Sequence, residues 1–91
     1  MSITLHIPGP LRPYCGNQPS LTLAATTVRG LLGRLEEQHP SLYRGVCDET
    51  NAVRRHINLF VNTTHIRDLQ GLETELASGD VVTILPAVSG G

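Results

Sequence analysis

Residues 79–86 read Gly-Asp-Val-Val-Thr-Ile-Leu-Pro, and this stretch decides the fold of the 91-residue chain. It opens with a turn signal and continues as a strand, in which Val82 and Ile84 share one face while Leu85 points to the other. Pro86 ends this strand or places it at an edge, because proline has no backbone N–H to donate. Where the strand lies in a sheet depends on the elements that come before it.

Alternating apolar residues predict three earlier strands, at residues 3–7, 21–23 and 57–61. We expect the first two to form an antiparallel pair, joined by a long turn-rich loop over residues 9–19. A further short edge strand is expected within residues 65–69. These strands flank a segment in which the hydrophobic period is different.

That segment predicts an amphipathic helix. Four apolar residues fall at i, i+3, i+4 and i+7, namely Val28, Leu31, Leu32 and Leu35. Thr26 or Thr27 is expected to cap the first turn, and the helix should end before Pro40. Gly30 and Gly33 each cost the helix about 0.8–1 kcal/mol relative to alanine. A close approach of helix to sheet is one structural reason for keeping them.

The expected order is therefore two strands, a helix, one or two strands and a final strand. Residues 42–46 should form a short irregular or helical segment, residues 48–55 a polar loop, and residues 69–76 one or two helical turns. This order is that of an α+β, ubiquitin-like β-grasp, with a mixed sheet of four to five strands and one main helix across it. Its last strand would pair in parallel beside the first. We expect the β-grasp domain over residues 1–86 and a flexible tail over residues 87–91.

Composition excludes several classes of protein. Hydrophobic residues make up 40% of the chain and charged residues 16%, as in an ordinary globular domain. The net charge of −1 argues against a general nucleic-acid binder, which needs a basic stripe to neutralise phosphates. No apolar run is long enough to cross a membrane, and no signal peptide is visible. We therefore expect a soluble, cytoplasmic protein.

The residues that most often carry chemistry are scattered. Cys15 and Cys47 do not have the spacing of metal ligands. Two cysteines could form one disulfide, but two free thiols are the simpler interpretation. The four histidines lie in different segments: His6, His39, His56 and His65. No P-loop or Gly-x-Gly-x-x-Gly motif is present. We expect no metal site, no nucleotide site and no catalytic residue in this chain.

The end of the chain is the stronger functional signal. The tail after Pro86 reads Ala-Val-Ser-Gly-Gly and carries no charged side chain. A frayed terminus is the alternative reading. Extended, five residues span up to about 17 Å, enough to bring Gly91 into a partner's active site. A carboxylate is a poor electrophile, so Gly91 would need activation, most simply as an acyl-adenylate.

Residues 79–91, GDVVTILPAVSGG, resemble the C-terminus of the ubiquitin-like sulfur-carrier proteins, the ThiS/MoaD family. The shared pattern is GD-x-V-x-I/F-x-P-x-x-x-GG. The resemblance is closest to the CysO-like branch, which serves cysteine biosynthesis. It extends to residues 7–8, 11–13 and 35–36 and to the loop before residues 56–62. It covers essentially the whole chain.

The resemblance implies a cycle in which this chain is a co-substrate and not an enzyme. An E1-like adenylating enzyme of the MoeB/ThiF type would use ATP and Mg²⁺ to adenylate Gly91, and sulfur transfer would then give a C-terminal thiocarboxylate. Gly90, Ser89 and Val88 would thread into the partner's site. The acceptor would be a PLP-dependent cysteine synthase or a thiazole-synthase-like enzyme. In the cysteine branch, a JAMM-type zinc peptidase would release the product.

A docking surface for the adenylating enzyme is expected beside the tail. Phe60 and Leu85 alternate with the residues that should pack under the helix, so both should face outward. The alternative is that the loop over residues 9–19 covers Phe60.

Two rival functions remain. One is a protein modifier joined through Gly91 to a target lysine; this chain has no lysine of its own. The other is a β-grasp binding module with an idle tail.

Overall fold

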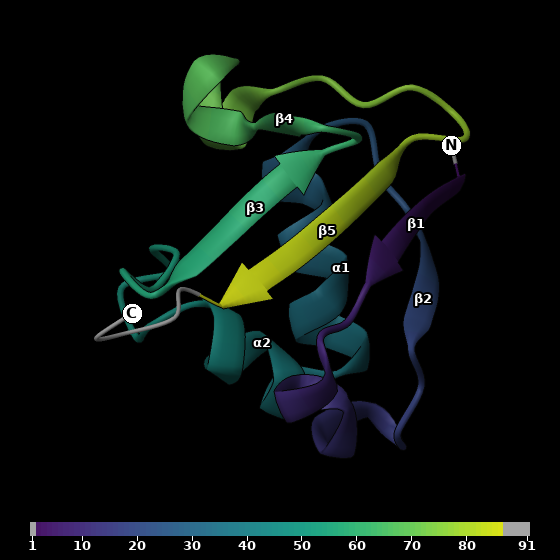
Figure 1. Ribbon diagram of the computed structural model, residues 1–91, viewed down its shortest axis with the longest axis vertical. Helices are drawn as coiled ribbons and strands as arrows, with labels where there is room; N and C mark the ends of the chain where they lie inside the picture. Colours follow the sequence, from purple (N-terminus) through teal and green to yellow (C-terminus); the bar gives the residue numbers. More distant parts are fainter. Residues whose placement is uncertain (1, 87–91) are drawn as a thin grey trace.

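Five strands form one mixed sheet in the order β2-β1-β5-β3-β4 (Figure 1). The computed structural model describes residues 2–86. The strands are β1 (Ser2–His6), β2 (Ser20–Ala24), β3 (Ile57–Val61), β4 (Thr64–His65) and β5 (Val81–Pro86). The helices are α1 (Val28–Gln38) and α2 (Pro40–Val46), with three 3₁₀ segments, η1 (Gly9–Cys15), η2 (Ile66–Asp68) and η3 (Gly71–Glu73).

The last strand lies at the centre of the sheet. β5 runs parallel to β1, with Leu5 opposite Val82, and antiparallel to β3, with Phe60 opposite Thr83. β1 and β2 pair antiparallel, as the alternation in the sequence predicted. The β-grasp prediction is therefore confirmed. The pairing of β5 with β1 ends at Thr83, whereas its pairing with β3 continues to Pro86.

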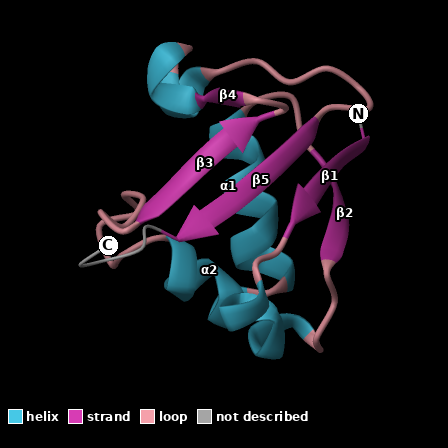
Figure 2. Ribbon diagram, in the orientation of Figure 1, coloured by secondary structure: helices cyan, strands magenta, loops and turns pink. Residues whose placement is uncertain are grey.

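The hydrophobic core fills one side of this sheet. Both helices lie on the same face (Figure 2), and the apolar side of α1 meets the inward residues of the strands. Leu31 and Leu35 of α1, and Leu5 and Leu59 of the sheet, are essentially inaccessible to solvent. Burying each leucine contributes about 1.5–3 kcal/mol, so this interface supplies much of the stability.

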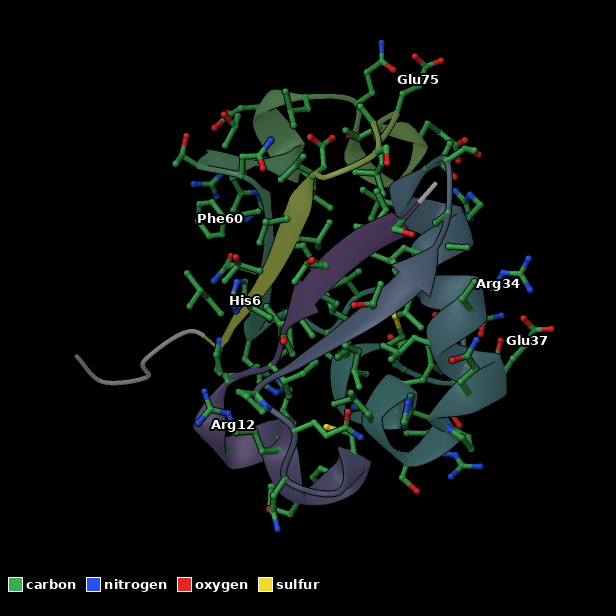
Figure 3. All side chains as sticks on the ribbon, turned by 90° about the vertical axis from the view of Figure 1, so that its right-hand side faces the viewer. His6, Arg12, Arg34, Glu37, Phe60 and Glu75 are labelled. Carbon is green, nitrogen blue, oxygen red and sulfur yellow. The ribbon has the colours of Figure 1, made fainter. Side chains whose placement is uncertain are left out.

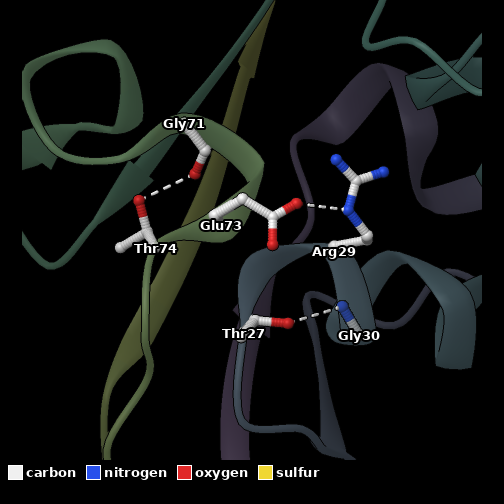
Figure 4. A network of polar contacts seen from close by, with 6 residues as sticks. All are labelled: Thr27, Arg29, Gly30, Gly71, Glu73 and Thr74. Atoms are coloured by element: carbon white, nitrogen blue, oxygen red, sulfur yellow. Dashed lines mark hydrogen bonds and ion pairs between the residues drawn. The ribbon is translucent and has the colours of Figure 1, made fainter.

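The first turn of α1 is tied to the segment that precedes β5. Of the two candidate caps, Thr27 is the one used: its Oγ1 accepts a hydrogen bond from the Gly30 N–H at 3.0 Å. The Arg29 guanidinium pairs with the Glu73 carboxylate at 2.6 Å, and the Thr74 hydroxyl donates to the Gly71 carbonyl at 2.7 Å (Figure 4). The long connection to β5 is thereby fixed against the helix.

Three local expectations need correction. The segment over residues 9–19 is not an open loop but contains η1, which packs against α2. The edge strand is shorter and earlier than expected, because it ends at His65 and η2 follows. No close approach explains the glycines: a Cβ on Gly33 would meet nothing within 4 Å.

Three further predictions, on the cysteines, a metal site and a membrane span, concern residues that the structure describes. Cys15 and Cys47 are free and buried, so no disulfide joins them. Within residues 2–86, no three histidine, cysteine or acidic side chains group closely enough to hold a metal ion. None of the helices in this range has the length and apolar character needed to span a bilayer.

Candidate functional site

One face of the sheet carries no helix. The side view shows the helices on one side of the strands, while His6 and Phe60 point to the other side (Figure 3). Four neighbouring strands contribute one cross-strand row to this open face, consisting of His6, Thr83, Phe60 and His65. The register of the sheet therefore aligns two histidines with the only phenylalanine of the chain.

Phe60 is half-buried, and His65 is the side chain packed against it. The two rings meet edge to face, with centroids 5.1 Å apart and planes at 68°. His65 is itself fixed, because Nδ1 accepts from the Arg67 backbone N–H at 3.0 Å and Nε2 lies 3.0 Å from Asn58 Oδ1. Nδ1 acts as an acceptor, so Nε2 carries the proton and donates to Asn58. The alternative in which residues 9–19 cover Phe60 is wrong, since η1 packs on the helix side.

Leu85 extends the apolar part of the open face. It lies diagonally across from Phe60, since Thr83 is the direct partner of Phe60. Its exposed fraction is 46%, one of the largest among the apolar side chains described. Phe60 and Leu85 thus lie on the face away from the helices, as expected. Their role in docking stays a prediction.

The outward positions of all five strands carry no aspartate, glutamate or arginine. They are Ser2, Thr4, His6, Ser20, Thr22, Ala24, Asn58, Phe60, His65, Val81, Thr83 and Leu85. Desolvating such a face costs less than desolvating a charged face, because no fixed charge loses its water. This composition suits a surface that is covered by a partner.

The tail leaves from the end of β5, beside this face. Pro86 is paired with Ile57 on β3, and on the other side β1 leads into Ile7, whose carbonyl accepts from Arg12 Nε at 3.0 Å. The body therefore fixes Pro86, the root of the tail, through its pairing with β3. Gly91, Gly90, Ser89 and Val88, with the predicted tail over residues 87–91, lie outside the described residues.

The cysteines have the surroundings of packing residues. Burial raises the pKa of the Cys47 thiol, which keeps it protonated and weakly nucleophilic. Its neighbour Tyr43 also has a raised pKa, mainly from burial, and donates its hydroxyl to Asn51 Oδ1 at 2.9 Å. The Cys15 thiol points to the Arg12 and Gln18 carbonyls at 3.5 and 3.6 Å. Neither thiol has a basic side chain bonded to it within residues 2–86.

The contact of Phe60 with His65 was not predicted from the sequence. The signal was present, because Asn62 and Thr63 form a two-residue connection between β3 and β4. A connection of that length fixes the pairing register and brings residues 60 and 65 opposite each other. The bond from His65 to Asn58 depends on the side-chain conformations and has no sequence signature.

Comparison with known proteins gives concordant matches over the whole chain. The model of the ThiS family matches residues 5–91. Sulfur carrier protein CysO from Mycobacterium tuberculosis is 37% identical over 93 residues, covering 100% of both chains. CysO in the crystal structure of the Amycolatopsis orientalis BexX/CysO complex is similar with a TM-score of 0.88 and 36% identity, covering 98% of this chain and 99% of that one.

A second group of similar proteins carries a different name. The solution structure of small archaeal modifier protein 1 from Methanosarcina acetivorans has a TM-score of 0.87 and 31% identity to this chain. The match covers 99% of this chain and 96% of that one. The fold and the sequence are thus shared with proteins named as carriers and with proteins named as modifiers.

Proposed function

Because this chain belongs to the ThiS family, we propose that it is a sulfur carrier whose terminal carboxylate, on Gly91, is the group that its partners modify. The family resemblance predicted from the sequence is confirmed by these matches. The single observation that carries the proposal is whole-length similarity to a named sulfur carrier, 37% identical over 93 residues. The relatives of this kind are carriers and not enzymes.

The proposed chemistry takes place in the partners. In the first step a carboxylate oxygen of Gly91 attacks the α-phosphorus of ATP, and pyrophosphate leaves as the acyl-adenylate forms. Hydrosulfide then attacks the acyl carbon, AMP leaves, and the product is a thiocarboxylate. ATP and Mg²⁺ bind to the E1-like adenylating enzyme in this scheme. The chain supplies only the carboxylate and the surface that presents it.

Several features of the body support this role. β5 stays paired with β3 up to Pro86, so the tail starts from a point fixed to the sheet. Gly90 and Gly91 have no side chains, which suits a narrow channel. The open face beside the root carries no fixed charge, and Phe60 and Leu85 provide its apolar centre. We propose that the adenylating enzyme covers this face while Gly90, Ser89 and Val88 occupy its channel.

The acceptor of the sulfur is a second partner. A CysO has been crystallised in complex with BexX. We propose that this chain likewise forms a complex with a protein partner, and that this partner is the synthase that accepts the sulfur. A PLP-dependent cysteine synthase and a thiazole-synthase-like enzyme are the two classes we consider. A JAMM-type zinc peptidase is part of the scheme only if cysteine is the product.

Mass spectrometry of the intact chain tests the proposal. The full chain is incubated with the E1-like enzyme of its own genome, ATP, Mg²⁺ and sulfide. We expect the mass gain of one oxygen exchanged for sulfur, located on the C-terminal peptide. A matched variant with phenylalanine appended after Gly91 should gain nothing, because the bulky residue blocks the channel and displaces the carboxylate. Equal sulfur transfer to this variant would overturn the proposal.

The second candidate function is protein modification. The similarity to small archaeal modifier protein 1 favours it, and both functions share the activation of Gly91. They differ at the acceptor, which for a modifier is a lysine of another protein. The chain has no lysine, so chains linked through its own side chains are excluded. In cells that co-express the adenylating enzyme, lysine-linked adducts on other proteins would favour this function over the carrier.

A further inference from the structure

Arginines lie in two segments of the chain that flank the end of β5 and contain no acidic residue. The eight acidic residues lie at positions 36, 37, 48, 49, 68, 73, 75 and 80. Residues 2–35 and 50–67 therefore contain none. Arg12 follows β1 in the first segment, and Arg54 and Arg55 precede β3 in the second. Because β5 lies between β1 and β3, the segment that follows β1 and the segment that precedes β3 lie on either side of the end of β5 (Figure 1).

Arg12 is anchored through one nitrogen and open through the others. Its Nε donates to the Ile7 carbonyl at 3.0 Å, which holds the guanidinium just beyond the end of β1. The residue is exposed. Among residues 2–86, the ion pairs involve Arg29 and Arg34, and Arg12 takes part in none. The two terminal nitrogens of Arg12 are thus available to an external acid.

The other side of the tail root is hollowed. A cavity of about 380 Å³ opens beside Ile57, the direct partner of Pro86. Arg54, Arg55 and Arg67 line it, and no aspartate or glutamate does. Its apolar lining comes from Ala52, Val53, Ile57, Leu59, Ile66 and Leu72. Arg54 is already engaged within the chain, because its Nε donates to the Arg44 carbonyl at 2.8 Å and its charge acts on the nearby Asp48 carboxylate. Its charge is therefore partly balanced by Asp48.

We propose that a basic collar, defined as Arg12, Arg55 and Arg67, binds an acidic surface around the mouth of the channel in the adenylating enzyme. The proposal rests on the function proposed above. The tail reaches only about 17 Å, so the body stops at the entrance and the collar meets the rim. Arginine pairs with carboxylates through two parallel hydrogen bonds, which fixes orientation as well as distance. An apolar side chain of the same rim fits the hollow beside Ile57.

An acidic protein surface fits this region better than a polyanion does. The net charge of the chain is −1, and the broad open face of the sheet bears no arginine. A nucleic acid or a membrane would meet three arginines in an otherwise neutral or acidic surface, too few for tight binding through phosphates. The apolar lining of the hollow also has no counterpart in a phosphate backbone.

The collar acts on association more than on the chemical step. Exposed charges attract a complementary surface before contact, and salt screens them over about 10 Å at 0.1 M ionic strength. Arg55→Glu should lower the association rate constant with the adenylating enzyme about tenfold at low salt. The effect should shrink toward none at about 0.5 M salt. The rate of thiocarboxylate formation at saturating enzyme should stay unchanged.

The test compares Arg55→Glu with Arg34→Glu, which changes the net charge equally but lies on α1, away from the tail root. Association is followed by stopped-flow fluorescence with the full chain at low and high salt. A second pair, Arg12→Lys and Arg12→Glu, separates charge from anchoring, and only Arg12→Glu should slow association strongly. Circular dichroism checks that each variant is folded.

The collar is refuted if Arg55→Glu and Arg34→Glu slow association equally, or if neither effect depends on salt. Loss of binding to single-stranded RNA or anionic vesicles in Arg55→Glu, with enzyme association unchanged, would assign the arginines to a polyanion and also overturn it. Failure of the proposed function looks different: the unsubstituted chain then forms no thiocarboxylate at any salt concentration. Association and chemistry are measured separately, so the two failures cannot be confused.

Discussion

At the scale of single residues, Phe60 is prepared for contact by its neighbour. His65 uses both ring nitrogens in hydrogen bonds, so its ring is fixed and holds Phe60 edge-on. A side chain already held in one rotamer loses less entropy when a partner covers it. Sequence alternation places Phe60 outward, but only the packed structure shows that it is half-buried and supported.

The substitution Phe60→Ala should weaken docking and leave folding nearly intact. Removing a central aromatic anchor typically costs an interface more than 1 kcal/mol, so we expect the KM of the adenylating enzyme for this chain to rise about tenfold. Leu69→Ala is a matched control, because Leu69 is 43% exposed but lies after η2, away from the open face. Steady-state kinetics measures both variants. Equal KM values for Phe60→Ala, Leu69→Ala and the unsubstituted chain would contradict docking through the open face.

At the scale of elements, α1 keeps two glycines that its packing against the sheet does not require. Both are exposed on the helix. A Cβ on Gly33 would meet nothing within 4 Å, whereas one on Gly30 would lie 3.3 Å from the Oγ1 of the capping Thr27. The reason expected from the sequence, a close approach of helix to sheet, is wrong. The helix thus carries an avoidable loss of stability.

Gly33→Ala should stabilise the protein, because alanine restricts the unfolded chain and favours the helix. The free energy of unfolding should rise by about 0.5–1 kcal/mol. Gly30→Ala should gain less, since its methyl group crowds the cap. Urea unfolding followed by circular dichroism measures both changes. A lower stability of Gly33→Ala would show that this position has a constraint beyond its own helix.

At the scale of the whole molecule, charge is separated although the net charge is only −1. Glu36 and Glu37 lie near the end of α1, and Asp48 and Glu49 follow α2, whereas the outward strand positions carry neither acid nor arginine. The arginines of the collar occupy the two segments without acids. A net charge near zero therefore argues against a polyanion as partner, but it does not exclude a local surface whose charge is complementary to a protein.

Both thiols belong to the single core, so their reactivity should report on global unfolding. Cys15 and Cys47 have exposed fractions of 4% and 1%. In iodoacetamide near neutral pH, the native chain should gain no adduct, while the same chain in denaturant should gain two; intact mass spectrometry counts them. Selective labelling of Cys15 under native conditions would instead reveal that η1 opens independently of the core.

The sequence by itself determined the elements in which the hydrophobic pattern repeats often enough to be recognised. Alternation along β1, β3 and β5, and the apolar stripe of α1, follow from geometry that repeats every two or 3.6 residues. The short elements were predicted less well for the same reason: residues 42–46 were expected to be irregular or helical, and residues 9–19 were expected to be a loop. α2 has seven residues and η1 is rich in proline, so neither repeats a pattern clearly. The predictions for Val88, Ser89, Gly90 and Gly91 rest on composition and family pattern alone.

Tertiary structure alone decided which distant residues meet. The sequence indicated that Phe60 and Leu85 share a face, because each strand alternates strictly. It did not indicate the hydrogen bond from His65 to Asn58 that fixes the ring beside Phe60, or that Arg12 and Arg55 lie at the same end of the sheet. The two arginines come from segments more than forty residues apart, which the parallel pairing of β5 with β1 and its antiparallel pairing with β3 bring together. Periodicity along a chain fixes the direction of side chains, whereas only the order of strands in the sheet fixes their neighbours.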